Sequence, residues 1–157
     1  MLFRSRPPFG IVLGSPVEVA ELAGSLPSSD IVCYQMELFQ AERLREALEE
    51  RGHFAQVKTA PDLWDLADPV QTLLYPVPKG GKRGLKLDMI EQAYHVLKPQ
   101  GTFVVLSPFE KDNLFPQALK KVFGKVHSPM EGHNQVFWCQ REGDRPRRRH
   151  EIGRAHV

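Results

Sequence analysis

The sequence lacks a long apolar run. No stretch approaches the ~20 apolar residues that a membrane-spanning helix needs. The first ten residues, MLFRSRPPFG, also lack the apolar segment of a signal peptide. These absences argue against a membrane-embedded or secreted protein, and we expect a cytoplasmic one with no membrane partner.

Cysteine is scarce as well. The only two, Cys33 and Cys139, each lie inside an apolar run, so buried free thiols in a reducing compartment are expected rather than a disulfide. Together with the six histidines, the cysteines show no spacing typical of metal ligands. We therefore expect no metal site.

Several catalytic signatures are missing. Residues 79–84 form a loop rich in glycine and basic residues, but it lacks the GxxxxGK[ST] spacing that cradles nucleotide phosphates. No Gly-x-Ser-x-Gly elbow is present, and nothing repeats at the period of a solenoid. The sequence thus excludes these nucleotide-hydrolase, esterase and repeat classes.

What is present is an ordinary globular composition with an uneven charge. The 157 residues are 41% hydrophobic and 25% charged, which suits one soluble domain. The formal net charge of the chain is +2. The four arginines at positions 145, 147, 148 and 149 contribute +4, so the net charge of the chain without them would be −2. A nearly neutral body with a basic tail argues against a uniformly basic nucleic-acid-binding domain.

Residues 73–108 form the central stretch of the chain. Residues 71–75 are apolar and predict a strand, and residues 102–106 carry no charge, which predicts a strand covered on both faces. Between them, one helical face is apolar, and residues 98–101 (KPQG) predict a type I turn after the helix. Strand, helix and strand together indicate a right-handed βαβ unit.

The remaining elements follow the same alternation. Strands are expected at residues 9–13, 30–34, 54–58, 125–127 and 135–140. Helices are expected at residues 38–51 and 113–123, and from Ser15, as the cap, to near Pro27. This order predicts an α/β fold: a Rossmann-like, doubly wound three-layer sheet, mostly parallel, with an antiparallel final strand.

Residues 75–108, YPVPKGGKRGLKLDMIEQAYHVLKPQGTFVVLSP, carry a family resemblance. They resemble the N-terminal half of the two-domain ribosomal RNA guanine-N2 methyltransferases, of the class I S-adenosylmethionine-dependent superfamily, and the similarity runs over most of residues 9–149. The resemblance implies about seven strands, with the last beside the fifth. It also implies an N-terminal copy that has lost its cofactor motifs and a C-terminal copy that does the chemistry.

The resemblance also suggests how the chain is divided. We interpret residues 1–144 as the methyltransferase-like domain and residues 145–151 as a basic linker toward a catalytic domain missing from this chain. Residues 152–157 (IGRAHV) look like a translated sequencing adapter, and we expect them to be non-native.

The positions that would hold S-adenosylmethionine in an active relative are altered. Such an enzyme needs a glycine-rich turn after the first strand, yet in the segment that begins at Leu13, Gly14 is the only glycine before Gly24, and Pro16 follows two residues later. It also needs an acid after the second strand. Glu37 is the candidate, although it could equally be a first-turn helix residue favoured by the dipole.

Later positions are altered too. Asp62 and Asp65 flank Trp64, where relatives often place an acid near the adenine, although Trp64 could simply cover the sheet edge. The amine-binding Asn/Asp-Pro-Pro-aromatic motif is replaced by Tyr75-Pro76-Val77-Pro78 followed by lysine. We expect no catalytic residue and no bound cofactor in this chain. S-adenosylmethionine would be bound by the catalytic domain of the parent enzyme. The positions regarded as vestigial are Gly14, Glu37, Asp62, Tyr75 and Pro76.

A basic loop is the remaining candidate for binding. Lys79, Lys82, Arg83 and Lys86 could contact RNA phosphates or form a solvated loop, and residues 145–149 have the same two interpretations besides that of a linker. We expect a noncatalytic domain that supports its catalytic domain and binds ribosomal RNA weakly. The alternatives are a self-sufficient small methyltransferase with degenerate motifs, and a nucleotide-binding or interaction module.

Overall fold

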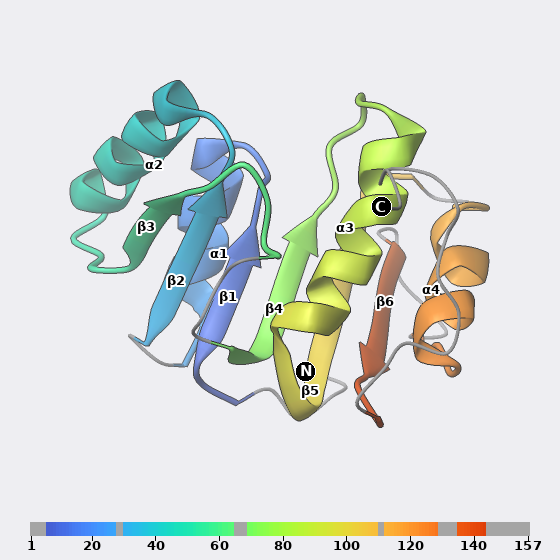
Figure 1. Ribbon diagram of the computed structural model, residues 1–157. Coiled ribbons are helices and arrows are strands. Elements are labelled where there is room, and N and C mark those ends of the chain that lie inside the picture. The colour runs from blue at the N-terminus through green and yellow to red at the C-terminus, as the bar shows by residue number, and fades with distance from the viewer. Residues whose placement is uncertain (1–5, 28–29, 65–68, 110–111, 129–134, 144–157) are drawn as a thin grey trace.

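The fold is a single six-stranded sheet with helices on both faces (Figure 1). A computed structural model of the chain describes residues 6–27, 30–64, 69–109, 112–128 and 135–143. The strands are β1 (Phe9–Val12), β2 (Ile31–Gln35), β3 (Gln56–Thr59), β4 (Val70–Pro76), β5 (Leu97–Ser107) and β6 (Gln135–Gln140). Helices α1 (Pro16–Ser25) and α2 (Leu38–Glu50) pack on one face, and α3 (Arg83–Val96) and α4 (Phe115–Phe123) pack on the other.

The strand order of the sheet reverses between β1 and β4. The order is β3-β2-β1-β4-β5-β6, with β1 to β5 parallel and β6 antiparallel to β5. The predicted Rossmann-like fold with an antiparallel last strand is therefore confirmed. In an open α/β sheet, ligands bind at the carboxyl ends of the strands where the order reverses, which here is between β1 and β4.

The helix boundaries follow from local signals in the sequence. The Ser15 hydroxyl accepts a bond from the Glu18 amide at the start of α1, and proline occupies the first turn. Gly124, with a φ of 93°, ends α4 in a conformation that favours glycine. None of the helices in the described part of the chain is both long and apolar enough to cross a membrane.

The uncharged run at residues 102–106 is an interior strand, as predicted. It lies between β4 and β6, parallel to the first and antiparallel to the second. Phe103 and Val105 face the core under α3 and α4, whereas Val104 faces the core under α1 and α2. Because both faces are buried, the segment carries no charged side chain.

The expected strand at residues 125–127 is reduced to a single bridge. Only His127 pairs with the sheet: its backbone exchanges two 2.9 Å hydrogen bonds with Trp138, and its ring stacks on the indole at 4.1 Å. Lys125 and His127 are both exposed, so burial does not stabilise a longer pairing. The described residues thus form six strands rather than seven.

The expected type I turn at residues 98–101 is also wrong. Helix α3 passes directly into β5 at Leu97, and the four residues lie within that strand. Gln100 has a φ of +66°, whereas a type I turn needs about −90° at its third position. The Gln100 amide donates to the Arg141 carbonyl at 2.8 Å, so pairing beyond the end of β6 holds this bend.

Arg141 fixes the chain where it leaves the sheet. Its Nη1 donates to the carbonyls of Tyr94 (3.0 Å) and Leu97 (2.6 Å), and its Nε donates to the carbonyl of Gly143 (3.0 Å). The guanidinium carbon lies 5.0 Å from the centroid of the Tyr94 ring. One side chain therefore joins the end of α3, the start of β5 and the segment after β6.

Candidate functional site

The turn after β1 is closed by the end of β4. Leu13 and Gly14 both have positive φ angles, 60° and 86°, before α1 begins. A Cβ on residue 14 would lie only 2.6 Å from Pro76 Cγ and 2.9 Å from Val19 Cγ2. The space beside Gly14 is therefore filled by the pyrrolidine ring of Pro76 and the side chain of Val19.

A buried amide spans the ends of β1 and β2. Gln35, the last residue of β2, is 4% exposed, and its Nε2 donates to the carbonyls of Leu13 (3.2 Å) and Gly14 (3.5 Å). Its own backbone carbonyl accepts a bond from the Ala60 amide at 3.0 Å. Sequence reasoning missed Gln35; the only signal was a polar residue directly after an apolar strand.

The two predicted acids, Glu37 and Asp62, take part in other local structure. Glu37 is exposed at the N-cap of α2 and makes no capping bond with its side chain. Asp62 accepts a 2.9 Å bond from the Trp64 amide, which closes a local turn, and the Trp64 ring lies 5.5 Å from that of His95. No hydrogen bond among the described residues joins Glu37 or Asp62 to Gly14, and Asp65 lies outside those residues.

Tyr75 is part of the core. It is 1% exposed, its ring stacks on Phe103 at 6.4 Å and meets the edge of Phe115 at 6.1 Å. Burial raises the pKa of its hydroxyl above the ordinary value. Val77 is buried in the same cluster, so two residues at the motif position contribute to packing under α3 and α4.

The residues at the carboxyl ends of β1 and β4 do not fit a cofactor held in the way the resemblance implies. The methionine end of S-adenosylmethionine would lie against the turn after Leu13, where Pro76 fills the space beside Gly14. The last residue of β2, Gln35, presents an amide that is already bonded to that turn. In the part of the chain that the structure describes, no group of three or more potential metal ligands is found.

The basic loop lies between β4 and α3. Lys79, Lys82 and Arg83 are exposed; Lys82 is the N-cap of α3 and Arg83 its first residue. The first turn of α3 contains no acid. The helix dipole disfavours cations at a helix N-terminus, so Lys82 and Arg83 lower the stability of α3 rather than raise it.

Lys86, in contrast, is largely buried. It is 9% exposed, its Nζ lies 5.8 Å from the centroid of the Phe109 ring, and its Cε would be 3.9 Å from a Cβ placed on Gly81. The side chain thus runs back along the helix toward the loop before Lys82. The structure brings Lys86 beside an aromatic residue that sequence reasoning missed.

Phe109 is held in place by the end of β5. Its amide donates to the Ser107 hydroxyl at 3.3 Å, and that hydroxyl donates to Asp112 Oδ2 at 2.6 Å. Asp112 Oδ1 accepts bonds from the amides of residues 114 and 115, each at 2.9 Å, at the start of α4. The ring itself is 43% exposed.

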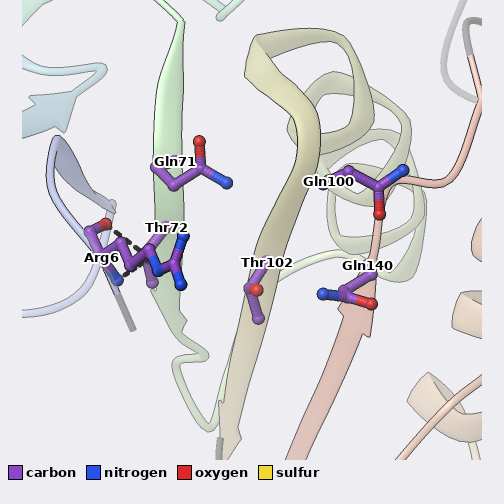
Figure 2. Close-up of a pocket in the computed structure, with 6 residues that line it drawn as sticks. All are labelled: Arg6, Gln71, Thr72, Gln100, Thr102 and Gln140. Carbon is purple, nitrogen blue, oxygen red and sulfur yellow. Dashed lines mark hydrogen bonds between the residues drawn. The ribbon is translucent and has the colours of Figure 1, made fainter. Parts of the chain in front are cut away.

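A small polar pocket lies at the opposite edge of the sheet. It has a volume of about 230 Å³, and Figure 2 shows its lining residues: Arg6, Gln71, Thr72, Gln100, Thr102 and Gln140. The Arg6 backbone exchanges two hydrogen bonds with the Thr72 hydroxyl, at 3.0 and 2.8 Å. Thr72, Thr102 and Gln140 pair across β4, β5 and β6. Arg6 is the one charged residue of this lining, which contains no carboxylate. The pocket lies near the start of β4, whereas Pro76 and the Gly14 turn lie at its carboxyl end.

Comparisons with known proteins identify the fold. No protein-family model matches the sequence, and no curated protein matches it closely enough to be named as a relative. The 16S rRNA N2 guanine methyltransferase RsmC of T. thermophilus, solved with AdoMet and guanosine, superposes with a TM-score of 0.66 at 19% identity, over 85% of this chain and 37% of that chain.

Two further structures are similar. An rRNA methylase of Streptococcus thermophilus has a TM-score of 0.58 at 15% identity, over 86% of this chain and 87% of its own. A ribosomal protein methylase of Lactobacillus delbrueckii subsp. bulgaricus has a TM-score of 0.67 at 13% identity, over 86% and 70%. At these identities the likeness establishes the Rossmann-like methyltransferase fold alone, and the chain spans little more than a third of RsmC.

Proposed function

We propose that this chain is the noncatalytic N-terminal domain of a cytoplasmic, S-adenosylmethionine-dependent ribosomal RNA guanine-N2 methyltransferase. It supports the catalytic domain that follows and helps to position RNA. Two findings support the proposal: the resemblance of residues 75–108 to that family, and the fold shared with RsmC over 37% of the RsmC chain.

The observation that carries the noncatalytic part is the contact between Pro76 and Gly14. A glycine is useful in a cofactor turn because it leaves the backbone accessible. Here the ring of Pro76 fills the space that a Cβ on Gly14 would need. Neither Tyr75 nor Val77 offers a side-chain oxygen to a substrate at the end of β4, because the Tyr75 hydroxyl is buried in the core and valine has no polar atom.

Isothermal titration of the purified chain with S-adenosylmethionine tests the proposal. We expect no saturable heat of binding, and no methyl transfer from labelled cofactor to ribosomal RNA. A cofactor-binding class I methyltransferase, titrated under the same conditions, serves as the positive control. Micromolar one-to-one binding would overturn the noncatalytic assignment.

A second candidate is a self-sufficient small methyltransferase. The match to the Streptococcus thermophilus rRNA methylase favours it, because the aligned region covers 87% of that enzyme and so leaves little room there for another domain. In this case Pro76 would have to move away from Gly14 when the cofactor binds. Hydrogen exchange at the amides of residues 13 and 14, with and without S-adenosylmethionine, distinguishes the two candidates: protection by the cofactor supports the small enzyme.

A further inference from the structure

We infer that the polar pocket near the start of β4 binds a small hydroxylated anion. The guanidinium group of Arg6 holds its phosphate or carboxylate group, and the amides and hydroxyls of the other lining residues hold its hydroxyl groups. The inference goes beyond the proposed function, because the pocket lies at the opposite end of β4 from Pro76 and the Gly14 turn.

A bulge in β5 forms one wall of the pocket. Between two successive pairs with β4, strand β5 holds residues 98–101 where β4 holds only Gln71. Bulges of this kind re-aim side chains and occur often beside functional sites. This one places Gln100 in the lining with a φ of +66°, a left-handed conformation that is uncommon for residues other than glycine.

The bulge is held rigidly by backbone contacts. The Gln100 amide donates to the Arg141 carbonyl at 2.8 Å, and the Arg141 amide donates to the Gly101 carbonyl at 2.9 Å. A Cβ on Gly101 would lie 2.8 Å from the carbonyl oxygen of Lys98 and 3.0 Å from that of Gln71, so the backbone is closely packed here. A wall fixed in this way is formed before a ligand arrives, which lowers the entropy lost on binding.

A row of three side chains forms the floor of the pocket. Thr72, Thr102 and Gln140 pair across β4, β5 and β6, so their side chains project from the same face of the sheet (Figure 2). The Thr72 hydroxyl is already bonded to the Arg6 backbone. The Thr102 hydroxyl and the Gln140 amide, for which no such bond is found among the described residues, can each donate and accept, as a hydroxyl group of a ligand requires.

Arg6 determines the charge of the ligand. Its backbone is fixed by Thr72, and its exposed side chain lies beside Thr72 in the pocket (Figure 2). A guanidinium group matches the geometry of phosphate and carboxylate, and the lining contains no carboxylate that would compete. The volume of about 230 Å³ exceeds what a single ion needs, since a water molecule takes roughly 30 Å³ of liquid. A sugar phosphate or a sugar acid fits this lining.

A magnetic-resonance titration of the isotope-labelled full chain with ribose 5-phosphate tests the pocket. We expect saturable shifts at the amides of Thr72, Gln100, Thr102 and Gln140, and none at the amide of Gly14. Ribose, which lacks the charge, and inorganic phosphate, which lacks the hydroxyl groups, should each bind about tenfold more weakly or worse. Gluconate carries a carboxylate instead of the phosphate, so the tighter of the two hydroxylated anions identifies the preferred anionic group.

Substitutions in the lining test each contact. Arg6→Met removes the guanidinium group and should weaken binding of ribose 5-phosphate by about tenfold or more. Thr102→Val removes only the hydroxyl and should weaken it by about threefold. Gln140→Glu places a carboxylate beside the anion and should weaken it by about tenfold or more. Matched controls are Arg43→Met on α2 and Gln56→Glu on β3, both exposed, which should bind like the unaltered chain.

A labelled oligouridylate distinguishes a free small molecule from the backbone of RNA, since both carry ribose phosphate. If Arg6→Met weakens binding of the oligouridylate as much as that of ribose 5-phosphate, the pocket holds a unit of an RNA strand. If only ribose 5-phosphate is affected, the ligand is a free small molecule. Both results support the pocket.

Two results would overturn the inference. One is that inorganic phosphate binds as tightly as ribose 5-phosphate and gluconate, or that none of them shifts the amides of the pocket. This comparison uses the unaltered chain, so it decides even where a variant fails to fold. The other is that Arg6→Met and Gln140→Glu, with unaltered circular dichroism, bind like the two controls. Neither result affects the titration with S-adenosylmethionine, which tests the proposed function separately.

Discussion

The ring of Pro76 at the end of β4 packs against Gly14 in the turn after β1, so closely that a Cβ on residue 14 would lie 2.6 Å from Pro76 Cγ. The contact joins the two strands between which the strand order of the sheet reverses. In an open α/β sheet this is where a ligand enters. Here the side chain of Pro76 fills the space beside Gly14, and this packing contributes to the stability of the fold.

Replacing Gly14 by alanine should therefore destabilise the domain. The φ of 86° disfavours any side chain, and the new methyl group would clash with Pro76 and Val19, so we expect a loss of about 3 kcal/mol in the free energy of unfolding. Urea denaturation measures it. The matched control is Gly24→Ala in α1, where no atom lies within 4 Å and a gain of about 0.5–1 kcal/mol is expected. Equal effects of the two changes would contradict the role of the Pro76 contact.

Removing the carboxylate of Asp112 should loosen the start of α4. Asp112→Ala removes the acceptor of the amides of residues 114 and 115 and the partner of the buried Ser107 hydroxyl, so the expected loss is about 1–2 kcal/mol. Thermal unfolding followed by circular dichroism measures it. Asp62→Ala, which removes one bond to the Trp64 amide, should cost less. A larger effect at Asp62 would show that the cap of α4 contributes little.

The exposed basic residues should determine how RNA binding depends on salt. Changing Lys79, Lys82 and Arg83 together to alanine should lower the slope of log K against log salt by up to about 2 for a single strand, because each phosphate contact contributes about 0.7. Anisotropy titrations at several salt concentrations measure the slope.

The control for this triple variant removes the same charge elsewhere: Lys120, Lys121 and Lys125 are also exposed, in and just after α4. Its slope should stay close to that of the unaltered chain. If the two triple variants lower the slope equally, RNA responds to the overall charge of the domain and the loop is only a solvated segment.

The two cysteines should make stability depend on alkaline pH. Burial raises the pKa of Cys33 and of Cys139 from 9.0 to about 12. The unfolded chain therefore releases these protons before the folded chain does. Their contribution to stability is complete below pH 9 and is lost as the pH rises toward 12.

Urea midpoints between pH 8 and pH 10, compared with those of Cys33→Ala and Cys139→Ala, measure this effect. Each variant should lose less stability over that interval than the unaltered chain, although it starts lower because of the cavity left in the core. Native thiols should also react slowly with a disulfide reagent at pH 8, and fully once the chain is unfolded. Rapid reaction of both thiols in the native state would contradict their burial.

The sequence predicted those parts of the fold that depend on local signals. Ser15 followed by proline marks a helix start, Gly124 marks a helix end, and the absence of charge in residues 102–106 marks a strand buried on both faces. Residues 98–101 were misjudged because proline and glycine suggest a turn, whereas pairing with the segment around Arg141 keeps them in the sheet. That pairing depends on a part of the chain far away in sequence.

The candidate site was less predictable for the same reason. The family resemblance implies that Tyr75 and Val77 stand where an active relative would carry amine-binding groups. It does not show that Pro76 contacts Gly14, because the two residues meet only when β4 pairs with β1. The burial of Lys86 and its contact with Phe109 likewise require α3 to pack beside the end of β5. Their residue types alone indicate an exposed lysine and a core phenylalanine.

The Arg141 contacts have a mechanical consequence. Strand β6 is antiparallel to β5, and its carboxyl end lies beside the start of β5. A force applied to the chain beyond residue 143 would therefore tend to break the hydrogen bonds between β5 and β6 one pair after another, beginning with the pair Thr102 and Gln140. Because Arg141 bonds to the carbonyls of Tyr94 and Leu97, the load passes first to α3 and β5. A force applied to the chain beyond residue 143 would then reach the body of the domain before it could peel away the outermost strand, β6.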